Sequence, residues 1–249
     1  MSIKYPDKKI IAVLPAYNAE KTLKRTVFDI PEDWIDEMIL VDDASKDNTV
    51  AIAKSLKLTV FVHNKNIGYG GNQKTCYREA LKSGADIIVM VHPDHQYDPR
   101  LVPDLLLPLL RGDSHAVFGS RMMESGMALK GGMPWWKYVA NIILTKIANL
   151  ILKLRLTEYH SGFRAYSKAA LNSIDYVKNS NSFVFDTQII IQLKLAGMKI
   201  IEVPITTRYF PEASTIGFTK SLSYGISILT NLLKYLAFKI GFIKHYNNQ

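Results

Sequence analysis

Short apolar runs alternate with amphipathic stretches through the first half of the chain. The apolar runs have the length of β-strands and fall at residues 9–14, 37–41, 59–62, 86–91 and 116–118. The stretches between them have helical length and fall at residues 19–30, about 47–56 and about 68–82. Strands that alternate with helices are typical of βαβ units, whose strands form a parallel sheet. With a further strand at 200–203, we expect an α/β fold whose mostly parallel sheet is flanked by helices.

A different pattern covers residues 135–154, which we expect to form a mostly apolar helix. One polar residue recurs every four positions, at Lys137, Asn141, Thr145, Asn149 and Lys153. This spacing places them in one stripe along the helix, which argues against a helix that spans a lipid bilayer. Two interpretations stay open. The helix lies in the membrane interface, with Trp135 and Trp136 at the depth of the headgroups, or it is a core helix with one solvent-exposed edge.

Residues 222–243 are also apolar, apart from Asn231, Lys234 and Lys239. Their number approaches the ~20 residues of a membrane-spanning helix. A lysine near the centre of such a span costs about 2.5–3.5 kcal/mol on insertion scales. We therefore favour a helix that lies on the surface. The expected organisation is a catalytic domain over 1–215, which includes a membrane-interface helix at about 133–156, followed by a basic amphipathic helix over 216–249.

The positive charge of the chain is concentrated in two segments. Residues 125–157 contain five basic residues and no acid, and residues 216–249 contain four and no acid. Together they account for the whole net charge of +9. Both segments are rich in aliphatic and aromatic residues, a combination that favours an anionic membrane surface as the partner. Nucleic acid is disfavoured, because the basic residues do not form dense Lys/Arg runs.

Composition adds two expectations about the class of protein and its compartment. A chain of 249 residues with 48% hydrophobic residues can build a full core, which excludes intrinsic disorder. A single cysteine, Cys76, excludes a disulfide framework and fits a reducing compartment. The first nine residues contain no apolar signal-peptide region. We expect a cytoplasmic protein held peripherally on the inner face of the membrane.

Candidate metal ligands follow the apolar run at 86–91. His92, Asp94 and Gln96 alternate, so an extended backbone would point all three side chains the same way. They lie at the carboxyl end of a strand, where open α/β sheets bind their ligands. Carboxylate and amide oxygens suit Mg²⁺ or Mn²⁺, and an imidazole shifts the preference toward Mn²⁺. The alternative is an ordinary polar loop at the end of a strand.

The ends of the first two strands carry candidate nucleotide-binding residues. Pro15 ends the first strand and leaves room for a flat ring beside Ala16 and Tyr17. Asp43 follows the second strand, where an acid in nucleotide-binding folds accepts hydrogen bonds from a base or a ribose. Asx residues at strand ends are also ordinary turn formers, so each position alone is only moderately specific.

Taken together, these motifs resemble the family-2 glycosyltransferases of the GT-A fold, which is Rossmann-like, and within them the polyprenyl-phosphate sugar transferases. The resemblance covers roughly residues 9–210. It rests on five ordered blocks: Leu14-Pro15-Ala16-Tyr17-Asn18, Val41-Asp42-Asp43-Ala44-Ser45, Asn66-Ile67-Gly68-Tyr69-Gly70-Gly71-Asn72, Asp94-His95-Gln96-Tyr97-Asp98-Pro99 and Ser161-Gly162-Phe163-Arg164-Ala165-Tyr166.

The resemblance implies a nucleotide-sugar donor and assigns residues to it. The nucleotide pocket would be lined by Pro15, Ala16, Tyr17 and Glu20. Asp42 and Asp43 would hold the nucleoside, and the glycine turn around Gly70 would let Asn72 approach the donor. The family's acidic motif reads Asp-x-Asp-x-Gln, with Mn²⁺ or Mg²⁺ as the cofactor. Here Asp94 and Gln96 remain, whereas His92 replaces the first Asp. Whether His92 ligates the metal, contacts a phosphate or only packs stays open.

The resemblance also implies phosphate-binding residues. Arg121, after the fifth strand, matches an arginine that meets the acceptor or donor phosphate, and the guanidinium fork suits phosphate oxygens. Lys137 and Asn141 match residues that grip the acceptor phosphate. Arg164 is either a phosphate contact or a structural ion-pair partner. Arg208 is either a phosphate contact or a solvated surface charge.

The acceptor can be inferred from what its chemistry requires. A hydroxyl acceptor needs a base, and the nearby candidates are Glu158, His160 and Asp186. The pair of acids that often precedes Ser161 in family-2 enzymes is absent. A phosphate acceptor, with a second pKa of about 6, is already ionised and needs no base. We therefore expect an inverting transfer of a hexose from a UDP or GDP sugar to a polyprenyl phosphate, catalysed through Asp94, Arg121 and Arg208. A hydroxyl acceptor (diacylglycerol or a glycan) and a pseudoenzyme disabled at His92 are the alternatives.

Overall fold

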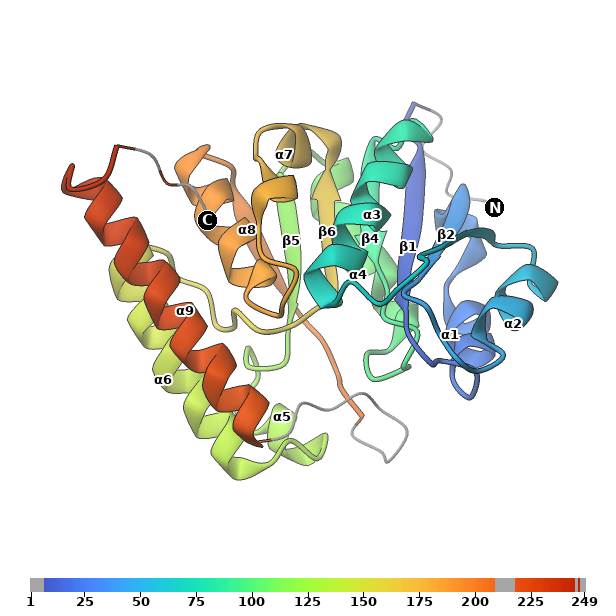
Figure 1. Ribbon diagram of the computed structural model, residues 1–249, viewed down its shortest axis with the longest axis horizontal. Coiled ribbons are helices and arrows are strands. Elements are labelled where there is room, and N and C mark those ends of the chain that lie inside the picture. Colours follow the sequence, from blue (N-terminus) through green and yellow to red (C-terminus); the bar gives the residue numbers. More distant parts are fainter. Residues whose placement is uncertain (1–6, 209–217, 245, 247–249) are drawn as a thin grey trace.

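The computed structural model describes residues 7–208, 218–244 and 246, and within them seven strands form one sheet (Figure 1). The strands lie in the order β3-β2-β1-β4-β6-β5-β7. They are β1 (Ile10–Ala16), β2 (Glu37–Asp42), β3 (Thr59–Val62), β4 (Ile87–Met90), β5 (Ala116–Ser120), β6 (Arg164–Ser167) and β7 (Ile200–Pro204). All neighbouring pairs are parallel except the two that contain β6. The expectation of a mostly parallel sheet is confirmed.

Helices cover both faces of this sheet, as the α/β pattern predicted. The α-helices of the described part are α1 (Leu23–Asp29), α2 (Thr49–Ser55), α3 (Tyr69–Lys82), α4 (Val102–Leu110), α5 (Met127–Lys130), α6 (Trp135–Leu152), α7 (Lys168–Asn172), α8 (Phe185–Leu195) and α9 (Phe218–Lys239). Short 3₁₀ turns add η1 (Glu32–Trp34), η2 (Pro99–Leu101) and η3 (Tyr176–Lys178).

The central strands β1 and β4 are apolar at consecutive positions because both of their faces are buried. In β1, Ile11 and Val13 join a core with α3, α6, α8 and α9, whereas Ile10, Ala12 and Leu14 join a second core with α1, α2 and α4. Side chains alternate across a strand, so a strand between two helical layers needs apolar residues throughout. This explains why the continuous apolar runs located these strands correctly.

The first helix differs from its expected range. We expected it over 19–30, but α1 begins at Leu23. The backbone amide of Ala19 donates to Thr49 Oγ1 at 2.7 Å, and that of Glu20 donates to Asp47 Oδ2 at 3.1 Å. These bonds satisfy the two amides from the start of α2, so the loop after β1 is tied to the loop after β2 before the helix begins.

The helix over 135–154 is present as α6, but its polar stripe does not form a solvent-exposed edge, apart from Lys153, which follows the helix and is exposed. Thr145 is buried, and Asn149 exchanges two hydrogen bonds with the backbone of Leu156, at 2.6 and 3.0 Å. The exposed face of α6 is instead largely apolar. It presents Trp135, Val139, Ile143 and Leu150. The interpretation of a core helix whose polar stripe faces solvent is therefore wrong, because the stripe faces the protein.

Helix α9 lies beside α6 and packs against α8 (Figure 1). Its residues Ile228, Leu232 and Tyr235 belong to the same core as β1 and α3. Asn231 is buried and accepts a hydrogen bond from Gln188 Nε2 at 3.0 Å. The C-terminal helix thus shares a core with the sheet, and the expected boundary at 215/216 falls outside the described residues.

The opposite side of α9 carries a continuous apolar stripe at helical spacing. The exposed residues are Leu222, Ile226, Leu229, Leu233 and Leu236, and Ile240 continues the stripe directly after the helix. The spacing alternates between four and three residues, which returns to one face of a helix. Among the helices of the described residues, none has the length and apolar character needed to cross a membrane.

Gly70, in the first turn of α3, allows this helix to approach the segment before α8. A Cβ at Gly70 would lie 2.4 Å from the carbonyl oxygen of Ser180 and 2.8 Å from Phe185 Cβ. We expect Gly70→Ala to lower the free energy of unfolding by roughly 1–3 kcal/mol, the usual cost of overpacking, measured by urea denaturation. Gly225→Ala in α9 is the control, since its Cβ would meet only Leu144 Cδ1 at 3.8 Å. Equal stability of the Gly70 variant and the wild type would contradict this assignment.

Candidate active site

A cavity of about 1040 Å³ lies where β1, β2, β4 and β5 end. The carboxyl edge of a parallel sheet is where open α/β folds bind ligands. The cavity brings together most of the side chains expected at the site. It is lined by Pro15, Ala16, Tyr17, Asp43, Asn72, His92, Asp94, Gln96, Arg121, Lys137 and Asn141.

One end of the cavity has the expected features of a nucleotide pocket. Pro15, Ala16 and Tyr17 form its edge, and the Tyr17 ring is half exposed. Asp43 lines the cavity while its carboxylate accepts the amides of Ile67 and Gly68, at 2.9 and 3.0 Å, and contacts His63 Nδ1 at 2.8 Å. Asp43 therefore also holds the loop that leads into α3.

Two buried acceptors lie behind this pocket. Asp42 accepts the amide of Ser45 through Oδ2 at 2.9 Å, and its Oδ1 has no hydrogen-bond partner among the described residues. Asn72 donates to the carbonyls of Val41 and Ala16, at 3.1 and 3.3 Å, and its Oδ1 likewise has no partner there. Asp42 does not line the cavity, whereas Asn72 does. Two buried acceptor oxygens that the described protein groups do not use therefore lie at or behind the wall of the pocket.

The loop after β4 is a turn, so the expectation of an extended backbone over 92–96 is wrong. Asp94 Oδ1 accepts the amide of Gln96 at 3.1 Å, and His95 has a positive φ of 56°. An aspartate that bonds the amide two residues later bends the chain. The loop is fixed from behind by α1, where Thr26 Oγ1 donates to the Pro93 carbonyl at 3.1 Å. Although the backbone is bent, His92, Asp94 and Gln96 all line the cavity.

His92 packs between aromatic and backbone groups. Its ring stacks on Tyr69 with centroids 5.7 Å apart and planes within 2° of each other. A Cβ at Gly162 would lie 2.4 Å from His92 Nε2, so only glycine leaves room for the imidazole. Burial lowers the pKa of His92, which favours the neutral ring. Nε2 is buried and has no hydrogen-bond partner among the described residues.

The donor set fits a cation that is shared with a substrate. Within the described residues, no group of three or more His, Cys, Asp or Glu side chains is placed to hold a metal ion. Asp94 offers one carboxylate to the cavity, next to Gln96 and to the neutral His92. Mg²⁺ is commonly held by one or two carboxylates, with substrate phosphates and water completing its shell. Asp94 is therefore sufficient for such a site, although not for an all-protein cage.

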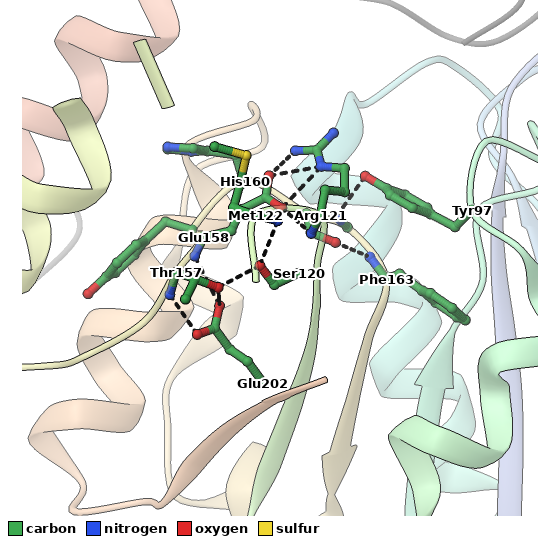
Figure 2. A network of polar contacts seen from close by, with 12 residues as sticks. Tyr97, Ser120, Arg121, Met122, Thr157, Glu158, His160, Phe163 and Glu202 are labelled. Atoms are coloured by element: carbon green, nitrogen blue, oxygen red, sulfur yellow. Dashed lines mark hydrogen bonds and ion pairs between the residues drawn. The ribbon is translucent and has the colours of Figure 1, made fainter. Parts of the chain in front are cut away.

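Arg121 reaches the cavity from the end of β5 and is held by Glu158 (Figure 2). Its Nε lies 2.9 and 3.1 Å from the two carboxylate oxygens of Glu158, and its Nη2 also donates to Oε1. Burial by itself raises the pKa of Glu158, but the charge and hydrogen bonds of Arg121 outweigh burial and bring that pKa below its ordinary value. Glu158 is therefore an ionised partner of Arg121.

Lys137 and Asn141 line the cavity from α6. Burial and, to a lesser extent, the positive charge of Arg121 lower the pKa of Lys137. Two cations that influence one another across a cavity create a site that favours an anion. The inward-facing stripe of α6 thus contributes to this positive end of the cavity.

Two of the predicted site residues, Arg164 and Glu20, are engaged outside the cavity. Arg164 is buried in the core, where it donates to the carbonyls of Ser161 and Tyr159 at 2.6 and 2.8 Å and pairs with Asp186 at 3.6 Å. Of the two roles left open for Arg164, these contacts correspond to the structural one. Glu20 Oε2 accepts two hydrogen bonds from Asn48 instead of lining the cavity.

Arg208 lies at the edge of the described region, outside the cavity lining. Its Nη2 donates to Asp98 Oδ2 at 2.9 Å, and its backbone amide donates to the Gln96 carbonyl at 2.9 Å. These contacts tie β7 to the loop after β4. The structure brings Arg208 next to the metal-site loop without placing it in the cavity.

An aromatic wall was not predicted from the sequence. It consists of Tyr69, Trp136, Phe183 and Tyr224. Tyr69 lies inside the glycine block and Trp136 beside Lys137, so adjacency to a motif could have indicated both. Phe183 and Tyr224 come from remote segments, and only the fold brings them to the cavity.

The candidates for a general base are all engaged with protein groups. Asp186 accepts from Tyr69 Oη at 2.8 Å and pairs with Arg164, and Glu158 is occupied by Arg121. His160 Nδ1 lies 3.2 Å from Tyr224 Oη, and burial lowers its pKa to about 4. A general base works best with a pKa near the operating pH, which His160 does not have. Protein groups occupy the other two candidates, Glu158 and Asp186.

A mostly parallel sheet with a cavity at its carboxyl edge and an acidic loop after β4 is the arrangement of the GT-A fold. The comparison with protein families agrees, because the model for glycosyl transferase family 2 matches residues 11–175. The chain belongs to this family.

Two relatives act on polyprenyl phosphates according to their names. The UDP-N-acetylglucosamine–dolichyl-phosphate N-acetylglucosaminyltransferase of Methanococcus voltae is 31% identical over 245 residues, covering 92% of this chain and 97% of that protein. The undecaprenyl-phosphate mannosyltransferase of Micrococcus luteus is 27% identical over 208 residues, covering 80% and 83%.

Solved structures support the fold assignment. Glucosyl-3-phosphoglycerate synthase from Mycobacterium tuberculosis, in complex with phosphoglyceric acid, superposes with a TM-score of 0.68 at 21% identity, covering 92% of this chain and 80% of that chain. The same enzyme with Mn²⁺, UDP and phosphoglyceric acid gives a TM-score of 0.67 at 19% identity, covering 93% and 78%. At this level of identity the likeness establishes the GT-A fold.

The lowered pKa of His160 predicts a pH-dependent stability. Between its ordinary pKa of about 6.5 and its folded pKa, the unfolded chain binds a proton that the folded chain excludes. The free energy of unfolding therefore falls as the pH drops from about 6.5 toward a pKa of about 4. We expect His160→Gln to reduce this slope by up to about 1.4 kcal/mol per pH unit, measured by denaturant unfolding at pH 7 and pH 5. The control is His115→Gln, outside the cavity lining, and an unchanged slope in the His160 variant would contradict the assignment.

Proposed function

We propose that this protein transfers a hexose from a UDP or GDP sugar to a polyprenyl phosphate at the cytoplasmic surface of the membrane, with inversion. The observation that carries the proposal is the pairing of a positive cavity wall, formed by Arg121 and Lys137, with the lack of a suitable base among Glu158, His160 and Asp186. A phosphate acceptor needs positively charged groups to bind it, and it needs no general base. The relatives named above, which use dolichyl and undecaprenyl phosphates, support the same acceptor class.

The reaction follows from the charge of the acceptor. Near neutral pH a phosphate monoester, with a second pKa of about 6, is already ionised. One of its oxygens attacks the anomeric carbon while the bond from that carbon to the nucleoside diphosphate breaks, and the bonding electrons leave with the diphosphate. A single in-line displacement inverts the anomeric configuration. Arg121 and Lys137 orient the attacking phosphate and offset its charge.

The donor end of the cavity has a separate set of tasks. Pro15, Ala16 and Tyr17 offer a surface for the base, and Asp43 and Asn72 line the cavity beside it. Asp94, with Gln96 and His92 beside it, is the residue that would hold Mg²⁺ or Mn²⁺. A bound divalent cation stabilises the charge that develops on the departing diphosphate. The neighbouring structures that contain Mn²⁺ or Mg²⁺ together with UDP support this cofactor class.

Peripheral membrane binding follows from the exposed faces of α6 and α9. Each helix turns an apolar stripe outward, and the stripe of α6 also includes the exposed Lys146. Apolar side chains with basic residues at their margin suit the interface of an anionic bilayer. The inner faces of the same helices line the cavity through Lys137 and Tyr224. A lipid phosphate could therefore keep its chain in the membrane while its headgroup enters the site.

A transfer assay tests the proposal. Purified protein with Mn²⁺ is incubated with radiolabelled UDP- and GDP-hexoses and, in detergent, with polyprenyl phosphate or diacylglycerol. We expect label in an acid-labile lipid fraction with polyprenyl phosphate only, and no label in the presence of a chelator. Label in diacylglycerol would overturn the phosphate acceptor. Donor binding by calorimetry without transfer to either lipid would instead indicate a glycan acceptor or a pseudoenzyme.

One variant tests the proposed metal site in the same transfer assay. We expect Asp94→Asn to lower turnover by at least the roughly 10–100-fold that even outer-shell changes cause, because the only carboxylate of the loop after β4 that lines the cavity is lost. Asp175→Asn, which breaks a surface pair with Lys178, is the control. Undiminished turnover of the Asp94 variant would remove the proposed metal site.

Membrane binding is tested with vesicles that contain anionic lipid. Leu150 and Leu233 are 81% and 63% exposed on α6 and α9. We expect the double change Leu150→Ser and Leu233→Ser to lower the vesicle-bound fraction several-fold in co-sedimentation, since each buried methylene contributes about 0.8 kcal/mol. Phe28→Ser removes an equally exposed side chain, 66% exposed, from α1 and is the control. Equal loss in both variants would indicate a general effect of hydrophobicity rather than this face.

A further inference from the structure

The carboxylate of Glu158 has an unusual position for a group beside an active site. Its side chain is fully buried, and it does not line the cavity. The carboxylate accepts the backbone amide of Arg121 at 2.9 Å as well as the Nε and Nη2 groups of the guanidinium (Figure 2). One carboxylate therefore fixes both the main chain and the side chain of the same arginine.

A second carboxylate, Glu202 of β7, holds the backbone that carries Glu158. It accepts the amide of Thr157 at 2.6 Å, the hydroxyl of Thr157 at 2.9 Å and the amide of Glu158 at 2.9 Å. The hydroxyl of Thr157 lies 2.6 Å from that of Ser120, at the end of β5 (Figure 2). Residues of β5 and β7 thus hold the dipeptide 157–158 in place through hydrogen bonds.

These contacts form a chain of support that leads from the sheet to the cavity. Glu202 restrains the backbone at Glu158, Glu158 restrains Arg121, and Arg121 lines the cavity. A guanidinium is a planar fork, so a carboxylate that binds two of its nitrogens also sets the direction of its plane. Side chains that bind a reacting group must be held this way by their neighbours, because misplacement by about 1 Å can cost roughly 10²-fold in rate.

We propose that Glu158 is a positioning residue for Arg121, and that Glu202 positions Glu158. Neither carboxylate contacts the substrate. The proposal rests on the proposed function in one respect, that Arg121 binds a phosphate of the donor or acceptor. It excludes Glu158 as the general base of a hydroxyl-acceptor reaction, and it gives Glu202, which no sequence motif marks, a defined task.

A double-mutant cycle tests the proposal in the full-length protein. We expect Glu158→Gln to lower kcat/KM for polyprenyl phosphate by roughly 10–100-fold, the scale of lost outer-shell support. Adding Glu158→Gln to Arg121→Ala should cost nothing further, since the residue to be positioned is gone. Losses that multiply in the double variant would overturn the proposal. Glu79→Gln, a carboxylate on α3 that pairs with Arg78 and Lys82 outside the cavity lining, is the matched control and should keep wild-type kinetics.

Glu158→Gln removes one partner of a buried ion pair, which can prevent folding. Glu202→Gln is therefore the second variant. It leaves the Arg121–Glu158 pair intact and replaces one accepting oxygen by an amide nitrogen. We expect a several-fold loss in kcat/KM with the thermal transition retained. Wild-type kinetics in Glu202→Gln would remove Glu202 from the proposal.

Two readouts separate positioning from base catalysis. If Glu158 only positions Arg121, the pH–rate profile of Glu158→Gln keeps the shape of the wild-type profile. Glu158→Asp should then restore part of the rate, because it keeps the charge. Loss of the acidic limb of the profile in Glu158→Gln would show that Glu158 is the base and would overturn the proposal.

A structural readout keeps this test independent of the proposed function. The Nε–H proton of Arg121, bound to a buried carboxylate, should give a slowly exchanging NMR signal that is lost in Glu158→Gln and weakened in Glu202→Gln. If the wild-type protein transfers no sugar to polyprenyl phosphate, the proposed function fails while this signal still decides the positioning role. An Arg121 signal that is the same in all variants would overturn the positioning role even if transfer is observed.

Discussion

The buried guanidinium of Arg164 is the interaction on which the cavity depends. Arg164 is the first residue of β6, the strand that runs antiparallel between β4 and β5. It pairs with Met90 at the end of β4 and with Phe118 within β5. The reversed strand delivers the preceding segment, residues 157–163, to the carboxyl edge of the sheet. Arg164 then fixes that segment through the carbonyls of Tyr159 and Ser161 and links it to α8 through Asp186. Such a charge is tolerated in the core because carbonyl oxygens, the Asp186 carboxylate and the ring face of Phe118 surround the guanidinium.

This arrangement separates the charges of the site. The loop after β4 brings the carboxylate of Asp94 to one side, and β5 and α6 bring Arg121 and Lys137 to the other. Because Glu158 already balances Arg121, the wall carries less net charge than its cations suggest, and a bound phosphate would meet an oriented guanidinium rather than an unbalanced field. Orientation, more than total charge, is therefore what the surrounding residues supply. The proposed phosphate acceptor and diphosphate donor both call for that property.

Sequence reasoning succeeded where the physical cause is local and failed where it is not. Buried parallel strands are apolar along their whole length, and their ends carry the polar residues, so the strands and the cavity residues after β1, β2 and β4 could be located from the pattern alone. The four-residue strand β6 lies inside a polar motif and has no such signature. Arg164 could not be assigned from its residue type, since a guanidinium suits a phosphate and a buried carboxylate equally well. Only the position of Asp186, 22 residues later, decides between them.

The two faces of α6 show how one periodic pattern can have two physical causes. Its polar stripe, with four-residue spacing, was compatible with a wet edge, yet Lys137 and Asn141 face the cavity and Asn149 binds the backbone at Leu156. With the polar side turned inward, the outward side is left apolar, beside the apolar stripe of α9. A polyprenyl phosphate is itself divided into an apolar chain and an anionic head. A helix that presents apolar residues to the outside and a lysine to the cavity matches both parts of that molecule across its own diameter of about 10–12 Å. The proposed function requires this of α6 and α9, because it assigns them both to the membrane surface and to the site.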